Sequence, residues 1–246
     1  MIETIMMCAA RIFTFDGEHR LTNASGFFFA RDEKLFLVTS RHVMYDQPSG
    51  HFPNRIEIEL HVDPENIAVS TGFSIPLYRE SKSQWRQGTD SAGEIDVAVI
   101  ELDREALPES AVYSAFGPQH LLDPDQVVGV GSSVLVIGFP LGFHDTLHHL
   151  PVVRQAGIAS AFGLRFQGEG YFLTDARTHR GGSGAPVVMR APADHEAGGD
   201  LPWILLGIHS ARLDVGTRDV RLDEALGLNC VWYADILMTL TEDQPA

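Results

Sequence analysis

The sequence contains little cysteine. Of its 246 residues only two are cysteine, Cys8 and Cys230, and they lie far apart in the chain. Two thiols can form at most one disulfide, whereas proteins of oxidising compartments are often cross-linked by several. The first residues carry Glu3 where a secretory signal needs basic charge, and their apolar stretch is too short for one. We therefore expect a cytoplasmic protein.

Long apolar runs and an excess of positive charge are also missing. No run of about 18 apolar residues exists, so the sequence predicts no membrane-spanning helix. Asp and Glu number 33 against 18 Lys and Arg, which gives a net charge of −15. Because nucleic acids and anionic membranes attract clustered positive charge, we expect neither as a partner. An apolar fraction of 44% is ample for a soluble core.

Helical periodicity is scarce, and short apolar or alternating runs recur instead. These runs are rich in β-branched and aromatic residues and are bounded by Gly, Pro, Asp or Ser, which is typical of strands. The predicted strands are residues 11–15, 26–30, 35–39, 55–62, 97–102, 133–137, 171–174, 185–189 and 203–208. The one good helix candidate is 233–241, where three apolar side chains share a face. Many short strands with few helices predict an all-β barrel or sandwich.

Two halves of similar size are expected. The proline-containing stretch 107–126 has mixed polarity and is predicted to connect them. The resulting division is 1–115 for the first barrel and 116–246 for the second barrel with the helix, together one functional domain. Residues 191–202 are polar and rich in Pro and Gly, which predicts an exposed loop.

A candidate nucleophile lies in the run Gly181-Gly182-Ser183-Gly184. A serine hydroxyl reacts only when a base takes its proton and donors stabilise the oxyanion that forms. Glycines beside the serine let the backbone turn tightly, so that successive N–H groups can point into one space. We expect the N–H groups of Gly181 and Ser183 to be those donors. Taken alone, such a run is equally typical of an ordinary turn.

A candidate base and its orienting acid precede the serine. His42 follows the apolar strand 35–39, and a histidine has the pKa range for general base work near neutral pH. Asp96 begins the apolar run 97–102, so we expect it to be partly buried and able to hold the imidazole in one tautomer. Asp90 and Glu94 are rivals for that role.

The three segments together resemble the chymotrypsin-like serine proteases. The serine loop with its following Ala185-Pro186, the segment 37–43 (Leu-Val-Thr-Ser-Arg-His-Val) and the segment Asp-Val-Ala-Val-Ile occur in the family's order. The nearer likeness is to bacterial proteases of the high-temperature-requirement type, supported by 134–142 and 157–160. This resemblance implies a double six-stranded β-barrel with a C-terminal helix, and a serine endopeptidase with His42, Asp96 and Ser183 as its triad.

The sequence departs from those relatives in two ways. Gly182 stands where digestive relatives carry an aspartate that pairs with a freed N-terminus, so that activation switch is expected to be missing. We also expect no peptide-binding PDZ domain after the protease domain. Regulation would then come from a protein partner, a loop rearrangement or oligomerisation.

The resemblance also implies which residues line the primary pocket. Its walls are expected from Thr178 and from the strand that contains His209, Ser210 and Arg212. A threonine and a histidine in this pocket are similar to those of bacterial glutamyl endopeptidases and of viral proteases that cleave after glutamine. Because both side chains can hydrogen-bond a carboxylate or carboxamide, the hypothesis is cleavage after Glu or Gln. The alternative is that His209 is simply a packed strand residue, and Arg212 departs from the small residue expected there.

Metal and cofactor are not expected. The loop 143–149 has four candidate ligands, three of them histidines, but no helix or hairpin to frame a site. Two other functions stay open beside the protease that acts on proteins or peptides. One is a catalytically silent peptide-binding module, and the other is a latent protease that a regulatory protein partner switches on.

Overall fold

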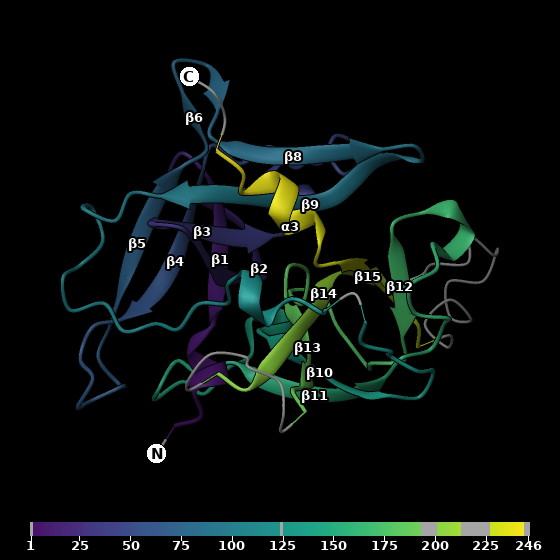
Figure 1. Ribbon diagram of the computed structural model, residues 1–246. Coiled ribbons are helices and arrows are strands. Elements are labelled where there is room, and N and C mark those ends of the chain that lie inside the picture. Colours follow the sequence, from purple (N-terminus) through teal and green to yellow (C-terminus); the bar gives the residue numbers. More distant parts are fainter. Residues whose placement is uncertain (1, 124, 193–200, 213–226, 244–246) are drawn as a thin grey trace.

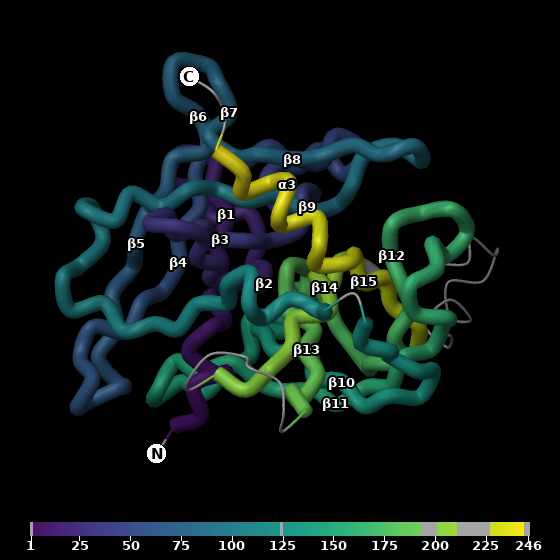
Figure 2. The backbone as a smooth tube through the Cα atoms, viewed as in Figure 1, coloured from purple at the N-terminus to yellow at the C-terminus, as the bar shows by residue number. Residues whose placement is uncertain are grey.

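The computed structural model describes residues 2–123, 125–192, 201–212 and 227–243. Two antiparallel sheets make up most of the molecule (Figure 1). The chain builds the first sheet before it passes to the second, and its C-terminal segment returns to the first, as Figure 2 shows. The predicted helix is present, shorter than expected, as α3 (Ile236–Leu240).

The first sheet has the strand order β5-β4-β1-β2-β3-β9-β8. Its strands are β1 (Ala9–Asp16), β2 (His19–Arg31), β3 (Lys34–Thr39), β4 (Arg55–His61), β5 (Ser70–Pro76), β8 (Trp85–Asp90) and β9 (Gly93–Leu102). Side chains of β1 and β4 alternate between buried and half-buried, which is the period-two pattern of strands that enclose a core on one face.

Seven strands form this sheet where six were expected. The reason is a small hairpin, β6 (Tyr78–Arg79) and β7 (Lys82–Ser83), which interrupts what would otherwise be one strand. The part before the hairpin, β5, pairs with β4, and the part after it, β8, pairs with β9. The Gln84 N–H donates to the Leu77 carbonyl oxygen (2.9 Å) at the base of the hairpin and holds the two parts together.

The second sheet has the order β11-β10-β13-β14-β15-β12. Its strands are β10 (Ser133–Gly138), β11 (Val152–Gly157), β12 (Tyr171–Thr174), β13 (Pro186–Arg190), β14 (Trp203–Arg212) and β15 (Asn229–Tyr233). An antiparallel bridge between Ile158 and Thr174 joins its two edges, so the sheet closes on itself. Closure leaves few unpaired strand edges.

Three apolar clusters hold the fold together. One fills the first sheet, around residues such as Ile12 and Leu37, and another fills the second, around residues such as Val187 and Leu206. The largest lies between the sheets and takes side chains from both. The helix α3 extends this contact, because a Cβ on Gly88 of β8 would lie only 3.5 Å from the Leu240 side chain.

The expected all-β, barrel-like fold with few helices is confirmed. No helix within the described ranges is long and apolar enough to cross a membrane. The two cysteines are free thiols, Cys8 buried and Cys230 half-buried. Most of the expected loop 191–202 lies outside the described residues.

Candidate active site

His42 and Asp96 meet at one end of the first sheet. His42 lies on the single helical turn α1 (Arg41–Met44) that follows β3, and Asp96 lies on β9, which pairs with β3. The His42 Nδ1 lies 2.7 Å from Asp96 Oδ2, and the backbone N–H of His42 donates to Oδ1 (2.9 Å). The carboxylate is thus fixed by two bonds to one residue, and it orients the ring so that Nε2 is left for chemistry.

Burial and charge act against each other in this pair. Burial by itself would lower the pKa of His42, but the hydrogen bond and the negative charge of Asp96 outweigh it, and the net pKa is raised. Burial would likewise raise the pKa of Asp96, whereas the hydrogen bond and charge of His42 bring it below its ordinary value. Both shifts favour a charged Asp96 and an imidazole that readily accepts a proton.

Two glycines in the serine loop cannot be replaced without strain. Gly181 has φ +89° and Gly184 has φ +86°, in the left-handed region that side chains disfavour. A Cβ on Gly181 would lie 2.5 Å from Asn23 Nδ2, and one on Gly184 would lie 2.1 Å from the Ser25 carbonyl oxygen. The loop therefore packs directly against strand β2 of the first sheet, which the absence of side chains at both positions permits.

In the serine loop, every second backbone N–H donates a hydrogen bond. The Gly182 N–H donates to the His179 carbonyl oxygen (3.1 Å), and the Gly184 N–H donates to the His209 carbonyl oxygen (2.7 Å). The N–H groups of Gly181 and Ser183 donate to no group of the described residues. Both residues line the same cavity as His42. The two amides expected to act as donors are thus the two that the fold leaves available.

The Ser183 hydroxyl donates to the carbonyl oxygen of Ser210 (2.9 Å). No hydrogen bond joins Ser183 to His42 in the part of the chain that the structure describes. Ser210, expected to line the substrate pocket, instead donates its own hydroxyl to Asp96 Oδ2. Its carbonyl oxygen and hydroxyl therefore contact two of the predicted catalytic residues, Ser183 and Asp96.

Ser25 joins the serine loop to the first sheet. Its side chain is fully buried, donates to the Gly181 carbonyl oxygen (2.8 Å) and accepts from the Phe139 N–H (2.9 Å). Its backbone N–H donates to the Ser183 carbonyl oxygen (2.9 Å). One residue of β2 thereby fixes the loop from two sides. Sequence reasoning assigned it no role, although it directly precedes the apolar part of β2 that begins after Gly26.

The predicted pocket residues Thr178 and His209 are both buried. Thr178 donates its hydroxyl hydrogen to Asn229 Oδ1, and Asn229 Nδ2 donates to the Ala176 carbonyl oxygen (2.6 Å). Burial, with a smaller contribution from the nearby His42, lowers the pKa of His209 to about 4, so its ring is neutral at pH 7. Asn229 was overlooked because it lies in the last strand, far from the motifs. The Arg212 side chain lies outside the described residues.

A cavity of about 780 Å³ adjoins the serine. It is lined by residues of three segments: the first half of β2 with His19 and Asn23, the stretch after α1 with Asp46 and His51, and the serine loop. Leu141 also lines it, with φ +55°, and the Leu141 N–H donates to the Arg180 carbonyl oxygen (2.5 Å). This bond ties the serine loop to the end of β10.

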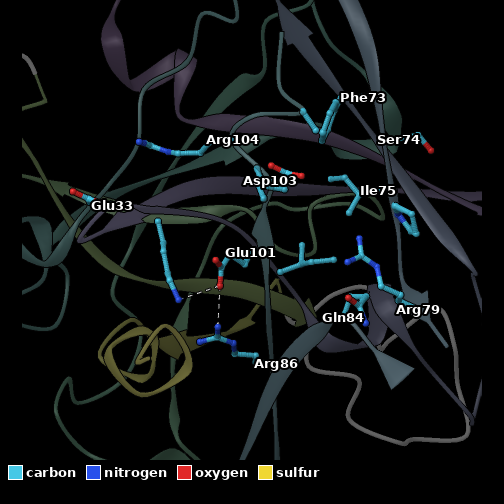
Figure 3. Close-up of a pocket in the computed structure, with 15 residues that line it drawn as sticks. Glu33, Phe73, Ser74, Ile75, Arg79, Gln84, Arg86, Glu101, Asp103 and Arg104 are labelled. Carbon is cyan, nitrogen blue, oxygen red and sulfur yellow. Dashed lines mark hydrogen bonds and ion pairs between the residues drawn. The ribbon is translucent and has the colours of Figure 1, made fainter. Parts of the chain in front are cut away.

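A second cavity, of about 690 Å³, lies on the first sheet and contains none of the predicted catalytic residues (Figure 3). Glu101 at its centre pairs with Lys34 (3.6 Å) and with Arg86 (3.0 Å). Glu101 is thus neutralised by two cations of the same cavity. Within the described ranges, no group of three or more His, Cys, Asp and Glu is arranged to hold a metal ion, and the histidine loop 143–149 falls inside those ranges.

Comparison with known proteins gives a family and a fold. The family described as the trypsin-like peptidase domain matches residues 24–191. Among solved structures, the serine endoprotease from Yersinia pestis matches with a TM-score of 0.55 and 16% identity, over 96% of this chain and 62% of that one. So low an identity shows a shared fold alone, and this chain spans less than two thirds of that protease. A search of curated proteins by sequence finds no match.

Proposed function

Because the chain belongs to the family of trypsin-like peptidase domains, we propose that it is a serine endopeptidase whose Ser183, His42 and Asp96 hydrolyse peptide bonds. The observation that carries the proposal is that His42, hydrogen-bonded to Asp96, lines the same cavity as Ser183 and Gly181. A charged, buried carboxylate that holds an imidazole is typical of a proton-transfer site. Packing alone does not require such a pair.

The mechanism follows from these groups. Ser183 Oγ attacks the carbonyl carbon of the scissile bond as its proton passes to His42 Nε2, and the carbonyl π electrons move onto oxygen. The N–H groups of Gly181 and Ser183 hydrogen-bond that oxyanion. On collapse the C–N bond breaks, and His42 gives its proton to the leaving amine. Water then attacks the acyl-enzyme by the same route in reverse and frees Ser183.

For specificity we propose cleavage after Gln or Glu, with Gln preferred. Thr178 has one hydroxyl hydrogen and commits it to Asn229, so toward a substrate it acts as an acceptor. His209 is neutral near pH 7 and can donate one N–H. An acceptor and a neutral donor suit a carboxamide, whereas a carboxylate buried beside a neutral imidazole would lose solvation without gaining a countercharge.

A latent form of the same enzyme is the second candidate. The Ser183 hydroxyl donates to the Ser210 carbonyl oxygen, which is an unproductive rotamer for attack. A regulatory protein partner or a bound substrate that competes for the Ser210 carbonyl would release the hydroxyl toward His42. In that case basal activity is low and rises when the partner binds.

The test is active-site labelling of the purified protein with a fluorophosphonate, followed by intact mass. Ser183→Ala is the first control and Ser133→Ala, an exposed serine remote from the cavity, is the second. We expect one adduct in the wild type and in Ser133→Ala, and none in Ser183→Ala. An adduct that persists in Ser183→Ala would refute the assignment of the nucleophile. No adduct in the wild type until partner proteins are added is the result expected of the latent form.

Specificity is tested with two matched internally quenched peptides that differ only in Gln or Glu before the cut. We expect the Gln peptide to be cleaved with the higher kcat/KM at pH 7, because the pocket offers no charge to a carboxylate. Cleavage only after Lys, or only after large apolar residues, would refute the pocket assignment and leave the catalytic assignment unaffected.

A further inference from the structure

Arg154 carries a charge that the fold does not pair. It lies on β11, opposite Val136 of β10, and is half-buried. Its Nε is shielded from solvent and has no hydrogen-bond partner. Nη1 and Nη2 are not shielded in this way, and among the described residues they too have no partner. A guanidinium stays protonated at any ordinary pH, so Arg154 offers a permanent positive charge and free N–H donors.

A cavity of about 460 Å³ adjoins this guanidinium. Arg154 lines it together with His179, which precedes the serine loop, and with Thr146. Within the described ranges, neither the ring of His179 nor the hydroxyl of Thr146 has a hydrogen-bond partner. A neutral imidazole and a hydroxyl each keep one hydrogen to donate, so three side chains of the wall have donors left for a ligand.

The cavity is lined by no carboxylate of the described residues. Asp145, next to Thr146 in the sequence, is already engaged: its Oδ2 lies 2.7 Å from His148 Nδ1, and its Oδ1 accepts from the Leu147 N–H (2.9 Å). The chain as a whole has a net charge of −15, so this cavity is opposite in sign to the protein around it. It suits an anion, since a neutral or cationic ligand would leave the guanidinium unpaired.

The rest of the wall is apolar and open to solvent. Phe143 is 68% exposed and Leu141 is 66% exposed, and both line the cavity with Pro140. Single exposed apolar side chains are common, but two at one cavity provide surface that an apolar ligand can bury. One guanidinium matches one negative charge. The wall therefore suits a carboxylate on an apolar body better than a doubly charged phosphate.

This cavity is separate from the one that contains the predicted catalytic residues. Neither His42 nor Ser183 lines it, and among the described residues Leu141 alone lines both. It nevertheless adjoins the serine loop, because the His179 carbonyl oxygen accepts from the Gly182 N–H (3.1 Å). A ligand here would contact the outside of the serine loop and leave the catalytic cavity open.

We propose that this cavity binds a small monocarboxylic acid with an apolar body. The Nη groups of Arg154 and the ring of His179 hold the carboxylate, and Phe143 and Leu141 cover the body. The site does not depend on the proposed peptidase function. A free organic acid and the C-terminus of a peptide share this chemistry, so the test includes both sources.

The experiment is calorimetric titration of the purified protein near neutral pH. The ligands are 3-phenylpropionate, its uncharged amide, and acetate, which has the charge without the apolar body. Each is titrated into the wild type, Arg154→Gln, Phe143→Ala and Arg177→Gln. Arg177 is the matched control, because it is an exposed arginine two residues before His179 and does not line the cavity.

We expect 3-phenylpropionate to bind at least about tenfold more tightly than its amide or acetate, because only this acid meets both the cation and the apolar wall. Arg154→Gln should weaken its binding by about tenfold or more, and Arg177→Gln should leave it unchanged. Phe143→Ala removes an exposed side chain and should weaken it by about threefold or more, which keeps the test valid if Arg154→Gln fails to fold. Equal affinities for acid and amide, or unchanged affinity in either cavity variant, would overturn the proposal.

Acetylphenylalanine carries the same carboxylate and ring at the end of a peptide unit. If its binding needs Arg154 and is tighter than that of 3-phenylpropionate, the natural ligand is a peptide C-terminus; weaker binding assigns the cavity to a free acid. Either result supports the carboxylate site. Affinity that persists in Arg154→Gln but is lost in His42→Ala would place the acid in the catalytic cavity, and this overturns the proposal.

Discussion

The hydroxyl of Ser25 links the nucleophile loop to the first sheet, and removing it should damage stability and reactivity together. In Ser25→Ala the Gly181 carbonyl oxygen loses its donor and the Phe139 N–H loses its acceptor. Both groups lie where Ser25 is fully buried, so each is left unsatisfied at a cost of about 1–3 kcal/mol. The two together predict a loss of about 2–4 kcal/mol in the free energy of unfolding, since some relaxation is expected.

The loop should also move, because Ser25 positions Gly181. Loss of one oxyanion donor typically costs about 100-fold or more, so a partial displacement should slow fluorophosphonate labelling of Ser183 by at least about tenfold. The assays are urea unfolding followed by tryptophan fluorescence and the labelling rate by intact mass. Ser133→Ala, an exposed serine on β10 that accepts a bond from Gln155, should lose less than about 0.5 kcal/mol. A Ser25→Ala protein as stable and as reactive as the wild type would refute the reasoning.

Three further predictions follow from the site. The labelling rate of Ser183 should rise with pH through a pKa above 6.5, because the base must be neutral and Asp96 raises the pKa of His42. Asp96→Asn should slow labelling and lower the midpoint of this pH profile. A flat profile would contradict the prediction. His209 is buried with a pKa of about 4 against an ordinary 6.5, so the free energy of unfolding should be highest above pH 6.5 and fall by about 3 kcal/mol towards pH 4. His209→Phe should remove that fall in urea unfolding. An unchanged dependence of the free energy of unfolding on pH in this variant would count against the prediction. Gly184→Ala should prevent folding. Gly163→Ala, with φ +82° but open space around it, should lower the free energy of unfolding by only about 1 kcal/mol in the same assay. Equal effects would show that the close contacts around Gly184 do not explain its need for glycine.

Most strands could be predicted from the sequence because their buried side chains recur in a regular pattern. The run 171–174 matches β12 residue for residue, and 55–62 overlaps β4 almost completely. Some strands that escaped prediction have side chains that mostly face solvent, as in β5, or form short polar runs, as in β8. The mostly buried β15 also escaped prediction. Such strands are specified by pairing with a neighbour, which is tertiary information that a local pattern lacks.

The residues of the site could be predicted only where they stand in a recognisable motif. His42, Asp96 and Ser183 stand in recognisable segments, and the structure brings all three to one place, while their catalytic roles remain for experiment. Ser25 and Asn229 act through hydrogen bonds to backbone atoms more than 50 positions away in the chain. The Ser183 hydroxyl bond to the Ser210 carbonyl is a choice of rotamer, which no sequence pattern encodes.

The division of the site between two sheets has a consequence for the chain as it is made. The base and its carboxylate are synthesised first, the serine comes more than 80 residues later, and Ser25 must find its partners in the second sheet before the loop takes shape. Under the proposed function, neither half alone would hold all three catalytic residues, so a growing or broken polypeptide would lack the complete site. Labelling of Ser183 would then report that both halves are complete and docked.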